Sequence, residues 1–314
     1  MKVLSPLFIA FVIMLFHPIS HAKNLNGFDL SRTTIPAEEI LHGGPAKDGI
    51  PALLTPVFQK GLRALDIHPN DKVFGLVIDG IAKAYPIKIL NWHEVVNDKF
   101  NESAVIVSYC PLCGSGMAFS SDVGYDMLTF GVSGLVYNSD VLMYDHQSNS
   151  LWSQIRGEAV SGSMRGKSLH QIPLQLMRWK KWLKANPDTL VLSTKTGFKR
   201  NYNIDPYQGY KRSPSLFFPV SETAPKQYFP KQLVLGFKSD AGPVAFSLSE
   251  LQRHNQISFT YQIANHTYMV HWNKKDQAAW ITDLQGAEIP TTLMYWFAWY
   301  TFYPETKVFL ASNN

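Results

Sequence analysis

Cysteine is rare in this chain: only two of the 314 residues are cysteines, Cys110 and Cys113. A metal site built from four sulfur ligands is therefore excluded. The Gly-x-Ser-x-Gly turn of α/β-hydrolases is absent, and the glycines of residues 42–53 lack the Lys-Ser/Thr pair that completes a phosphate-binding loop. These absences argue against a serine hydrolase and against a nucleotide cofactor.

Runs of like charge are also missing. The formal net charge is +5, but the basic residues are scattered, and the densest stretches, 178–184 and 198–202, are short and contain aromatic residues. A nucleic-acid surface needs more positive charge gathered on one face. We therefore expect no nucleic-acid partner. The hydrophobic content of 46% and charged content of 17% indicate a globular chain with a substantial core.

The N-terminus has the three parts of a secretory signal peptide. Lys2 precedes an apolar run over residues 3–16, and Ser20 and Ala22 form a small-x-small cleavage pattern. This predicts a signal peptide over 1–22 and a protein exported to the periplasm or secreted. Later apolar stretches such as 293–303 are too short to span a bilayer, so no membrane span is expected after cleavage.

Two pairs of segments resemble each other in the same order. Residues 73–90 align with 234–251, and residues 178–192 align with 295–309, where both copies carry Trp-x-x-Trp followed by Pro, an acidic residue and Thr. Strand-like alternation dominates and helical periodicity is scarce. We therefore predict an α+β, mainly β fold with two duplicated β-rich units packed together. Their expected ranges are 23–204, enlarged by the cysteine-containing segment, and 231–314, joined by a linker over 205–230 that wraps the surface or covers the site.

The sequence Cys-Pro-Leu-Cys-Gly at residues 110–114 has the form of a metal-binding knuckle. Proline fixes the backbone after the first cysteine, and glycine permits the left-handed turn that follows the second. Two thiolates can then reach one ion. Among the nearby candidates for further ligands, His93 is the preferred one. Two thiolates with an imidazole form a soft ligand set, which favours copper first and zinc second.

Two alternatives use the same cysteines. In an oxidising compartment the pair can act as a redox dithiol, or it can form a local disulfide with a structural role only. If the protein is an enzyme, Cys110, Cys113, His93 and Glu94 are the candidate catalytic residues, and a metal-dependent oxidoreductase is one candidate activity. The expected partner is a small molecule or a redox protein.

Further polar and sulfur-containing residues are candidates for a pocket beside the knuckle. Strand alternation places Asn138 and Asp140 on one face and Tyr137 on the other; the alternative is a turn with side-chain hydrogen bonds. Met117 and His146 are the remaining candidates, the former only four residues beyond Cys113.

Several blocks of the sequence together resemble one family. They include AYPIKILNWHEVVND (84–98), VSYCPLCGSGMAF (107–119), FGVSGLVYNSDVLMYD (130–145), LWSQIRGEA (151–159) and WFAWYTFYPET (296–306). Over nearly the whole mature chain the sequence is similar to the bacterial and archaeal domain of unknown function 3179 family. The resemblance implies that the Trp-His-Glu and Cys-Pro-Leu-Cys segments act together, and it names no substrate.

Overall fold

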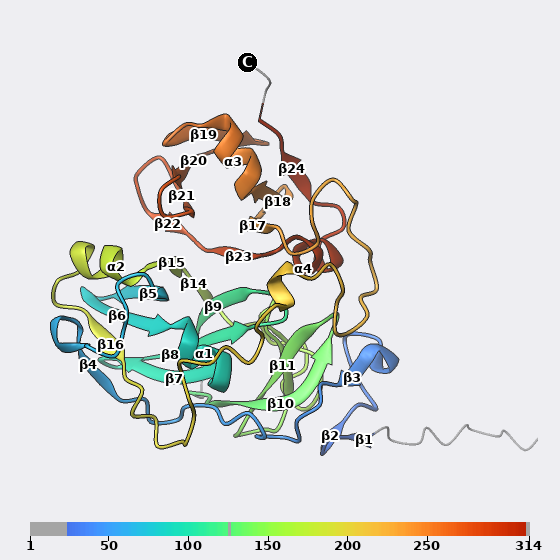
Figure 1. Cartoon of the computed structure of the whole chain (residues 1–314). Coiled ribbons are helices and arrows are strands. Elements are labelled where there is room, and N and C mark those ends of the chain that lie inside the picture. The colour runs from blue at the N-terminus through green and yellow to red at the C-terminus, as the bar shows by residue number, and fades with distance from the viewer. Residues whose placement is uncertain (1–23, 125–126, 312–314) are drawn as a thin grey trace, which may run out of the picture.

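The computed structural model describes residues 24–124 and 127–311 (Figure 1). Within these residues the fold is mainly β, with five sheets of four or five strands in a propeller-like arrangement and one two-stranded sheet. The prediction of a mainly β fold is confirmed. The predicted signal peptide lies outside the described residues. In the described ranges, no helix combines the length and apolar character that a membrane crossing requires.

Three of the sheets belong to the first part of the chain. The first has the strand order β15 (Gln175–Arg178), β5 (Lys72–Ile78), β6 (Ile81–Pro86), β16 (Leu190–Leu192), β4 (Phe58–Lys60). The second has the order β14 (Gln171–Ile172), β9 (Ser115–Ser120), β8 (Ser103–Cys110), β7 (Val95–Phe100). The third has the order β13 (Glu158–Ala159), β12 (Leu151–Ser153), β11 (Asp140–Asp145), β10 (Phe130–Tyr137), β3 (Ile40–His42).

The last part of the chain forms the other two sheets. One has the order β23 (Thr291–Tyr295), β17 (Leu233–Ser239), β18 (Gly242–Ser247), β24 (Lys307–Phe309), and the other β19 (Ser258–Ile263), β20 (His266–Asn273), β21 (Ala278–Thr282), β22 (Glu288–Ile289). The short elements are β1 (Asn24–Leu25), β2 (Phe28–Asp29), the helices α1 (Ile87–His93), α2 (Trp179–Ala185), α3 (Leu248–His254), α4 (Trp296–Phe302), and the 3-10 turns η1 (Ala37–Glu39), η2 (Gly61–Arg63), η3 (Tyr210–Arg212).

The segments that resemble each other in sequence share a strand order. β5 pairs with β6 and β15 antiparallel while β6 pairs with β16 parallel, and β17, β18, β23 and β24 repeat this pattern. The antiparallel set β7, β8, β9 and β14 likewise corresponds to β19, β20, β21 and β22. Repetition is therefore visible in the order and pairing of the strands.

The molecule is nevertheless not clearly a pair of duplicated units. The sheet of β10 to β13 with β3 has no counterpart in the described residues that follow position 231. Strands β10 to β13 of this sheet, inserted between β9 and β14, account for the enlargement. The cysteine loop belongs to the repeated part, since Cys110 pairs with Ser115 across the β8–β9 hairpin as Asn273 pairs with Ala278 across β20–β21. The domain boundaries at 204 and 231 stay predictions.

A glycine facing a tryptophan explains the Trp-x-x-Trp repeat. A Cβ at Gly75 would lie 2.2 Å from the Trp182 ring, and one at Gly236 would lie 2.1 Å from the Trp299 ring. Each indole also donates a hydrogen bond of 2.8 Å, from Trp182 Nε1 to Thr189 Oγ1 and from Trp299 Nε1 to the corresponding Thr306 Oγ1. The threonine of the repeated motif thus holds the ring on the glycine of the adjacent strand.

We predict that Gly75→Ala and Gly236→Ala each lower the free energy of unfolding by about 1–3 kcal/mol, because the methyl group would overlap the indole. Urea unfolding followed by tryptophan fluorescence measures this loss. Val77→Ala, at a half-exposed position of the same strand β5, is the matched control and should change stability much less. Glycine variants with the same free energy of unfolding as the wild type would contradict this packing.

Candidate metal centre

The β8–β9 hairpin presents both cysteines at the centre of the molecule. Cys110 ends β8, Ser115 begins β9, and Gly114 has a left-handed φ of +63°. A Cβ at Gly114 would also lie 2.8 Å from the Tyr295 ring, so glycine is required here twice over. The Tyr295 N–H donates to the Cys113 carbonyl over 2.8 Å, which ties the loop to β23.

A second hairpin brings an aspartate to the cysteines. Asn138 and Ser139 both have positive φ values, 53° and 63°, in the two-residue turn between β10 and β11. The turn given above as the alternative is therefore confirmed, and the strand alternation across these residues is wrong, because the chain reverses between Tyr137 and Asp140. The thiols of Cys110 and Cys113 face the Ser139 carbonyl at 3.7 and 3.2 Å.

Cys110, Cys113 and Asp140 form a cluster that could hold a metal ion. One ligand atom from each lies within 4.8 Å of the others, and all three side chains are buried. Asp140 Oδ2 accepts hydrogen bonds from the Ile155 N–H (3.0 Å) and Ser153 Oγ (3.4 Å), whereas buried Oδ1 has no hydrogen-bond partner among the described residues.

Burial dominates the electrostatics of this cluster. It raises the pKa of the Asp140 carboxyl from 3.8 to about 8, although the hydrogen bonds that the carboxylate accepts act in the opposite direction. Burial and the neighbouring Cys110 and Asp140 also raise the pKa of the Cys113 thiol well above its usual value. Without a cation, the cluster therefore disfavours negative charge on the Asp140 carboxyl and on the Cys113 thiol.

A buried glutamine connects the two hairpins. Ser115 Oγ donates to Gln154 Oε1 over 2.6 Å, and Gln154 Nε2 donates to Ser108 Oγ and to the Ser115 carbonyl. Gln154 directly follows β12, and β12 pairs with β11, the strand that carries Asp140. The hydrogen bonds of Gln154 therefore fix the cysteine hairpin relative to Asp140. The cluster is thus positioned by sheet structure on both sides.

His93, predicted as the third ligand, is not part of the cluster. Its Nδ1 lies 2.8 Å from the Pro51 carbonyl and its Nε2 lies 2.7 Å from the Tyr202 hydroxyl, so both ring nitrogens are used. Burial lowers the pKa of this imidazole. The physical reason for the correction is that α1 ends at His93 and turns the ring towards residues 51 and 202, while Asp140 takes the place beside the thiols.

Glu94 lies beside an apolar pocket that also reaches Cys110. The pocket has a volume of about 340 Å³, and Leu112, Tyr207 and Phe217 are among its lining residues. The Tyr207 hydroxyl donates to Glu94 Oε1 over 3.2 Å. Burial, opposed by this hydrogen bond, raises the pKa of Glu94 from 4.5 to about 7. A carboxyl group with this pKa can exchange a proton near neutral pH.

Comparison with known proteins identifies the family to which the chain belongs. The model of the family described as "Protein of unknown function (DUF3179)" matches residues 47–306. The chain belongs to the DUF3179 family. Comparisons with curated proteins and with solved structures gave no match. The cluster, Glu94 and both hairpins all lie inside the matched range of this DUF3179 protein.

The other predicted pocket residues have separate surroundings. Met117 is buried in the same core cluster as both cysteines. Tyr137 packs edge-on against Phe302, and the Asn138 side chain accepts the Ser221 N–H over 2.7 Å. His146 contacts Thr129 in an exposed position, away from the cluster.

The segment 205–230, predicted as a linker, supplies site residues that the sequence did not single out. Figure 1 shows this yellow-to-orange segment running past α1 towards α4. Tyr207, Phe217 and Phe218 line the apolar pocket, and Ser139 Oγ donates to the Phe218 carbonyl over 2.8 Å. The aromatic residues of the segment were the available signal, since solvated linkers seldom contain so many.

We predict that Glu94→Gln changes the pH dependence of stability. Between pH 4.5 and about 7 the folded protein holds the Glu94 proton more tightly than the unfolded chain does, so the wild type loses stability as pH rises through this window. The variant should lack the Glu94 contribution to this loss, which amounts to at most about 3 kcal/mol, and keep the contribution of Asp140, whose pKa is raised over the same range. Urea unfolding of metal-free protein at pH 4 to 8 measures it.

Glu102→Gln, at an exposed position in the turn between β7 and β8, is the control and should follow the wild type. Parallel stability curves for the wild type and Glu94→Gln would refute the buried, protonated state of Glu94.

Proposed function

We propose that this protein is a metalloprotein whose ion is held by Cys110, Cys113 and Asp140. The observation that carries the proposal is a buried cluster in which a carboxylate oxygen of Asp140 and two free thiols lie within 4.8 Å of one another. Oδ1 of the same carboxylate is buried and has no hydrogen-bond partner among the described residues. A buried carboxylate without compensation is strongly unfavourable, and a divalent cation would compensate it together with both thiolates.

The donor set favours zinc over copper. Zinc accepts cysteine sulfur and aspartate oxygen together, whereas copper(I) prefers soft sulfur donors alone. Exchanging the expected His93 imidazole for a carboxylate therefore moves the preferred metal from copper to zinc. Three protein ligands would leave the fourth coordination position of a tetrahedral zinc ion open for water or a substrate, as in catalytic zinc sites.

The apolar pocket supports an enzymatic role. Cys110 lies on its wall together with Glu94, whose pKa of about 7 suits a general acid or base. We propose that a small, largely apolar molecule binds there and that Glu94 takes up or releases its proton. The bound metal would supply Lewis-acid chemistry to such a ligand. We further infer export, on the signal-peptide pattern of residues 1–22.

A redox dithiol is the second candidate, because the two thiols are adjacent and the Asp140 carboxyl beside them, with a pKa of about 8, can exchange a proton near neutral pH. Both cysteines are at most 1% exposed, however, and a catalytic dithiol needs access for its partner. Thiol titration of purified protein separates the two. Thiols that react only after a chelator is added support the metal site, whereas an oxidised, chelator-insensitive pair supports a redox or structural disulfide.

We predict that the wild type binds one equivalent of Zn²⁺ in competition with a chromophoric chelator. Cys110→Ser, Cys113→Ser and Asp140→Asn should each weaken binding at least about 100-fold, since each removes a ligand rather than an outer contact. Metal-free Asp140→Asn should be as stable as metal-free wild type or more stable, because a buried unpartnered carboxyl is removed.

Asp145→Asn is the matched control on the same strand. The Asp145 carboxylate accepts bonds from the Ser148 N–H, the Ser148 hydroxyl and Trp152 Nε1, so its loss should reduce stability by about 1–3 kcal/mol and leave zinc affinity intact. Zinc binding that survives Asp140→Asn but fails in Asp145→Asn would reject the proposed ligand set.

A further inference from the structure

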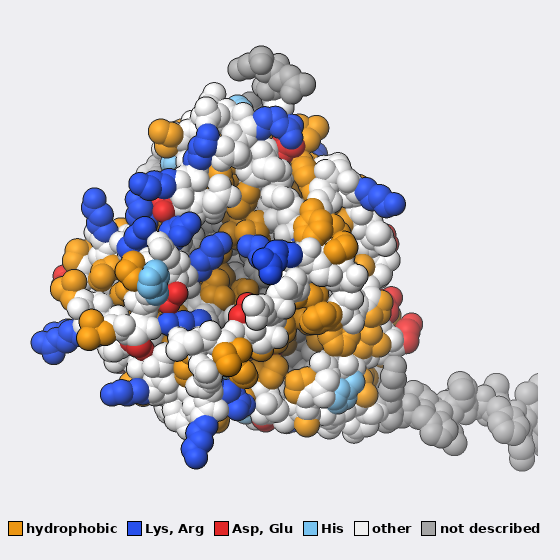
Figure 2. Space-filling view, in the orientation of Figure 1, with side chains coloured by type: hydrophobic (Ala, Val, Ile, Leu, Met, Phe, Trp, Pro, Cys, Tyr) orange, Lys and Arg blue, Asp and Glu red, His pale blue; other side chains and the backbone are white. Residues whose placement is uncertain are grey.

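The cysteine loop borders two pockets. Cys110 and Leu112 line the apolar pocket, whereas Pro111 and Gly114 line a second pocket of about 350 Å³, and Tyr207 lines both. The second pocket, here called the cationic pocket, also includes Lys72, Lys211 and Tyr210. Figure 2 shows Lys and Arg side chains gathered around a hollowed part of this face of the molecule.

Lys72 lacks a compensating carboxylate. Its side chain is half-buried, and no ion pair joins Lys72 or Lys211 to an acidic group of the described residues. Burial and then the nearby Lys211 and Arg178 lower the pKa of Lys72 to about 8. Lys72 of β5 and Lys211 of the segment 205–230 therefore share the pocket and repel each other, and Arg178 of β15 adds to the repulsion on Lys72.

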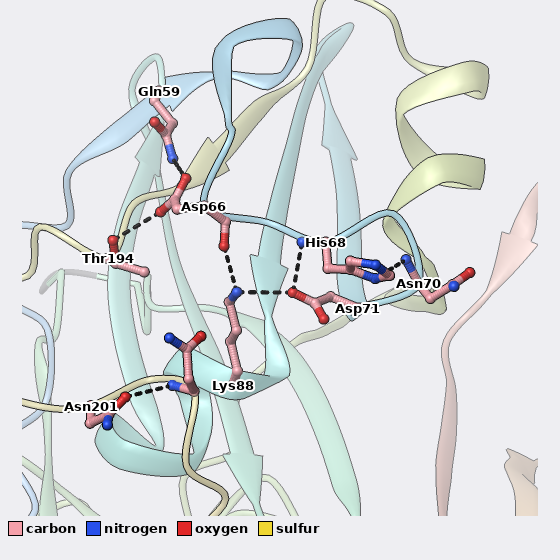
Figure 3. A network of polar contacts seen from close by, with 9 residues as sticks. Gln59, Asp66, His68, Asn70, Asp71, Lys88, Thr194 and Asn201 are labelled. Carbon is pink, nitrogen blue, oxygen red and sulfur yellow. Dashed lines mark hydrogen bonds and ion pairs between the residues drawn. The ribbon is translucent and has the colours of Figure 1, made fainter.

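The third lysine of the pocket is already neutralised. Lys88 lies 2.9 Å from Asp71 Oδ2 and donates to the Asp66 carbonyl over 2.6 Å (Figure 3). The other acidic group of the pocket, Asp205, accepts hydrogen bonds from Asn91 Nδ2 and from a backbone N–H. Asp71 is thus ion-paired with Lys88, whereas Asp205 is held by neutral donors and forms no ion pair with Lys72 or Lys211.

Phenol groups complete the lining. The Tyr210 hydroxyl is buried and has no hydrogen-bond partner among the described residues, and Tyr295 lines the same pocket. Burial and the nearby cysteines raise the pKa of both phenols, so they remain neutral hydrogen-bond donors at physiological pH. Unpaired cations together with unused donors are the features of an anion site.

We propose that the cationic pocket binds a small anion with a carboxylate or phosphate group, seated between Lys72 and Lys211 with the Tyr210 hydroxyl as a donor. The site includes Pro111 and Gly114 of the cysteine loop but neither cysteine nor Asp140, so it does not depend on the metal. An anion would relieve the repulsion between the lysines and satisfy a hydroxyl that is otherwise buried without a partner.

Isothermal titration of the full chain with inorganic phosphate and, separately, with succinate tests the proposal. At least one anion should bind the wild type, and the anion that binds identifies the group recognised. Lys72→Met and Lys211→Met should weaken its binding about tenfold or more, because each removes a charge-assisted hydrogen bond. Lys72→Arg keeps the charge and should bind more tightly than Lys72→Met.

Lys275→Met is the matched control. It removes the same charge from an exposed position in the β20–β21 turn, which corresponds to the cysteine loop, and should bind like the wild type. Asp140→Asn should also retain anion binding, which distinguishes this site from the metal centre. In anion-free buffer, Lys72→Met should melt at or above the wild-type temperature. Absence of binding by the wild type to both anions, or unchanged binding in both lysine-to-methionine variants, would overturn the proposal.

Discussion

One buried carboxylate next to two buried thiols is the constraint on which the centre of this structure depends. Asp140 is 0% exposed, and one of its oxygens has no partner among the described residues. A fold can retain such a group only if a proton or a cation compensates its charge. The raised pKa values of Asp140 and Cys113 mean that protons compensate the charge in the metal-free protein. A bound metal ion would be the second way to compensate it.

The surrounding sheets hold this cluster in place from two directions. The β8–β9 hairpin carries the cysteines and belongs to the repeated part of the fold, whereas the β10–β11 hairpin carries Asp140 and belongs to the inserted sheet. In the corresponding β20–β21 hairpin, residues 273–278 have the sequence Asn-Lys-Lys-Asp-Gln-Ala and contain no cysteine. The cluster that could hold a metal ion therefore lies where the inserted sheet meets the repeated one, and Gln154 connects the two.

Sequence patterns predicted the strands and the cysteine pair but only part of the site. Alternation and turn residues are local signals, and they identified β5, β6, β17 and β18 because those strands pair with their neighbours in sequence. Asp140 was expected near the pocket but not as a ligand, since its position depends on two left-handed residues in the preceding turn. His93 was expected beside the cysteines, but both ring nitrogens are bonded to Pro51 and Tyr202, which are 42 and 109 residues away and give no local signal. Lys72 and Tyr210 meet only through long-range packing.

The most direct test of the central claim is X-ray absorption at the zinc edge on the zinc-loaded protein. Coordination by Cys110, Cys113 and Asp140 predicts two sulfur neighbours at about 2.3 Å and an oxygen shell at about 2.0–2.2 Å. No multiple scattering from imidazole should be present, because both His93 nitrogens are bonded elsewhere. A spectrum with nitrogen and oxygen neighbours only, or with imidazole scattering, would contradict the assignment of this cluster as the metal centre.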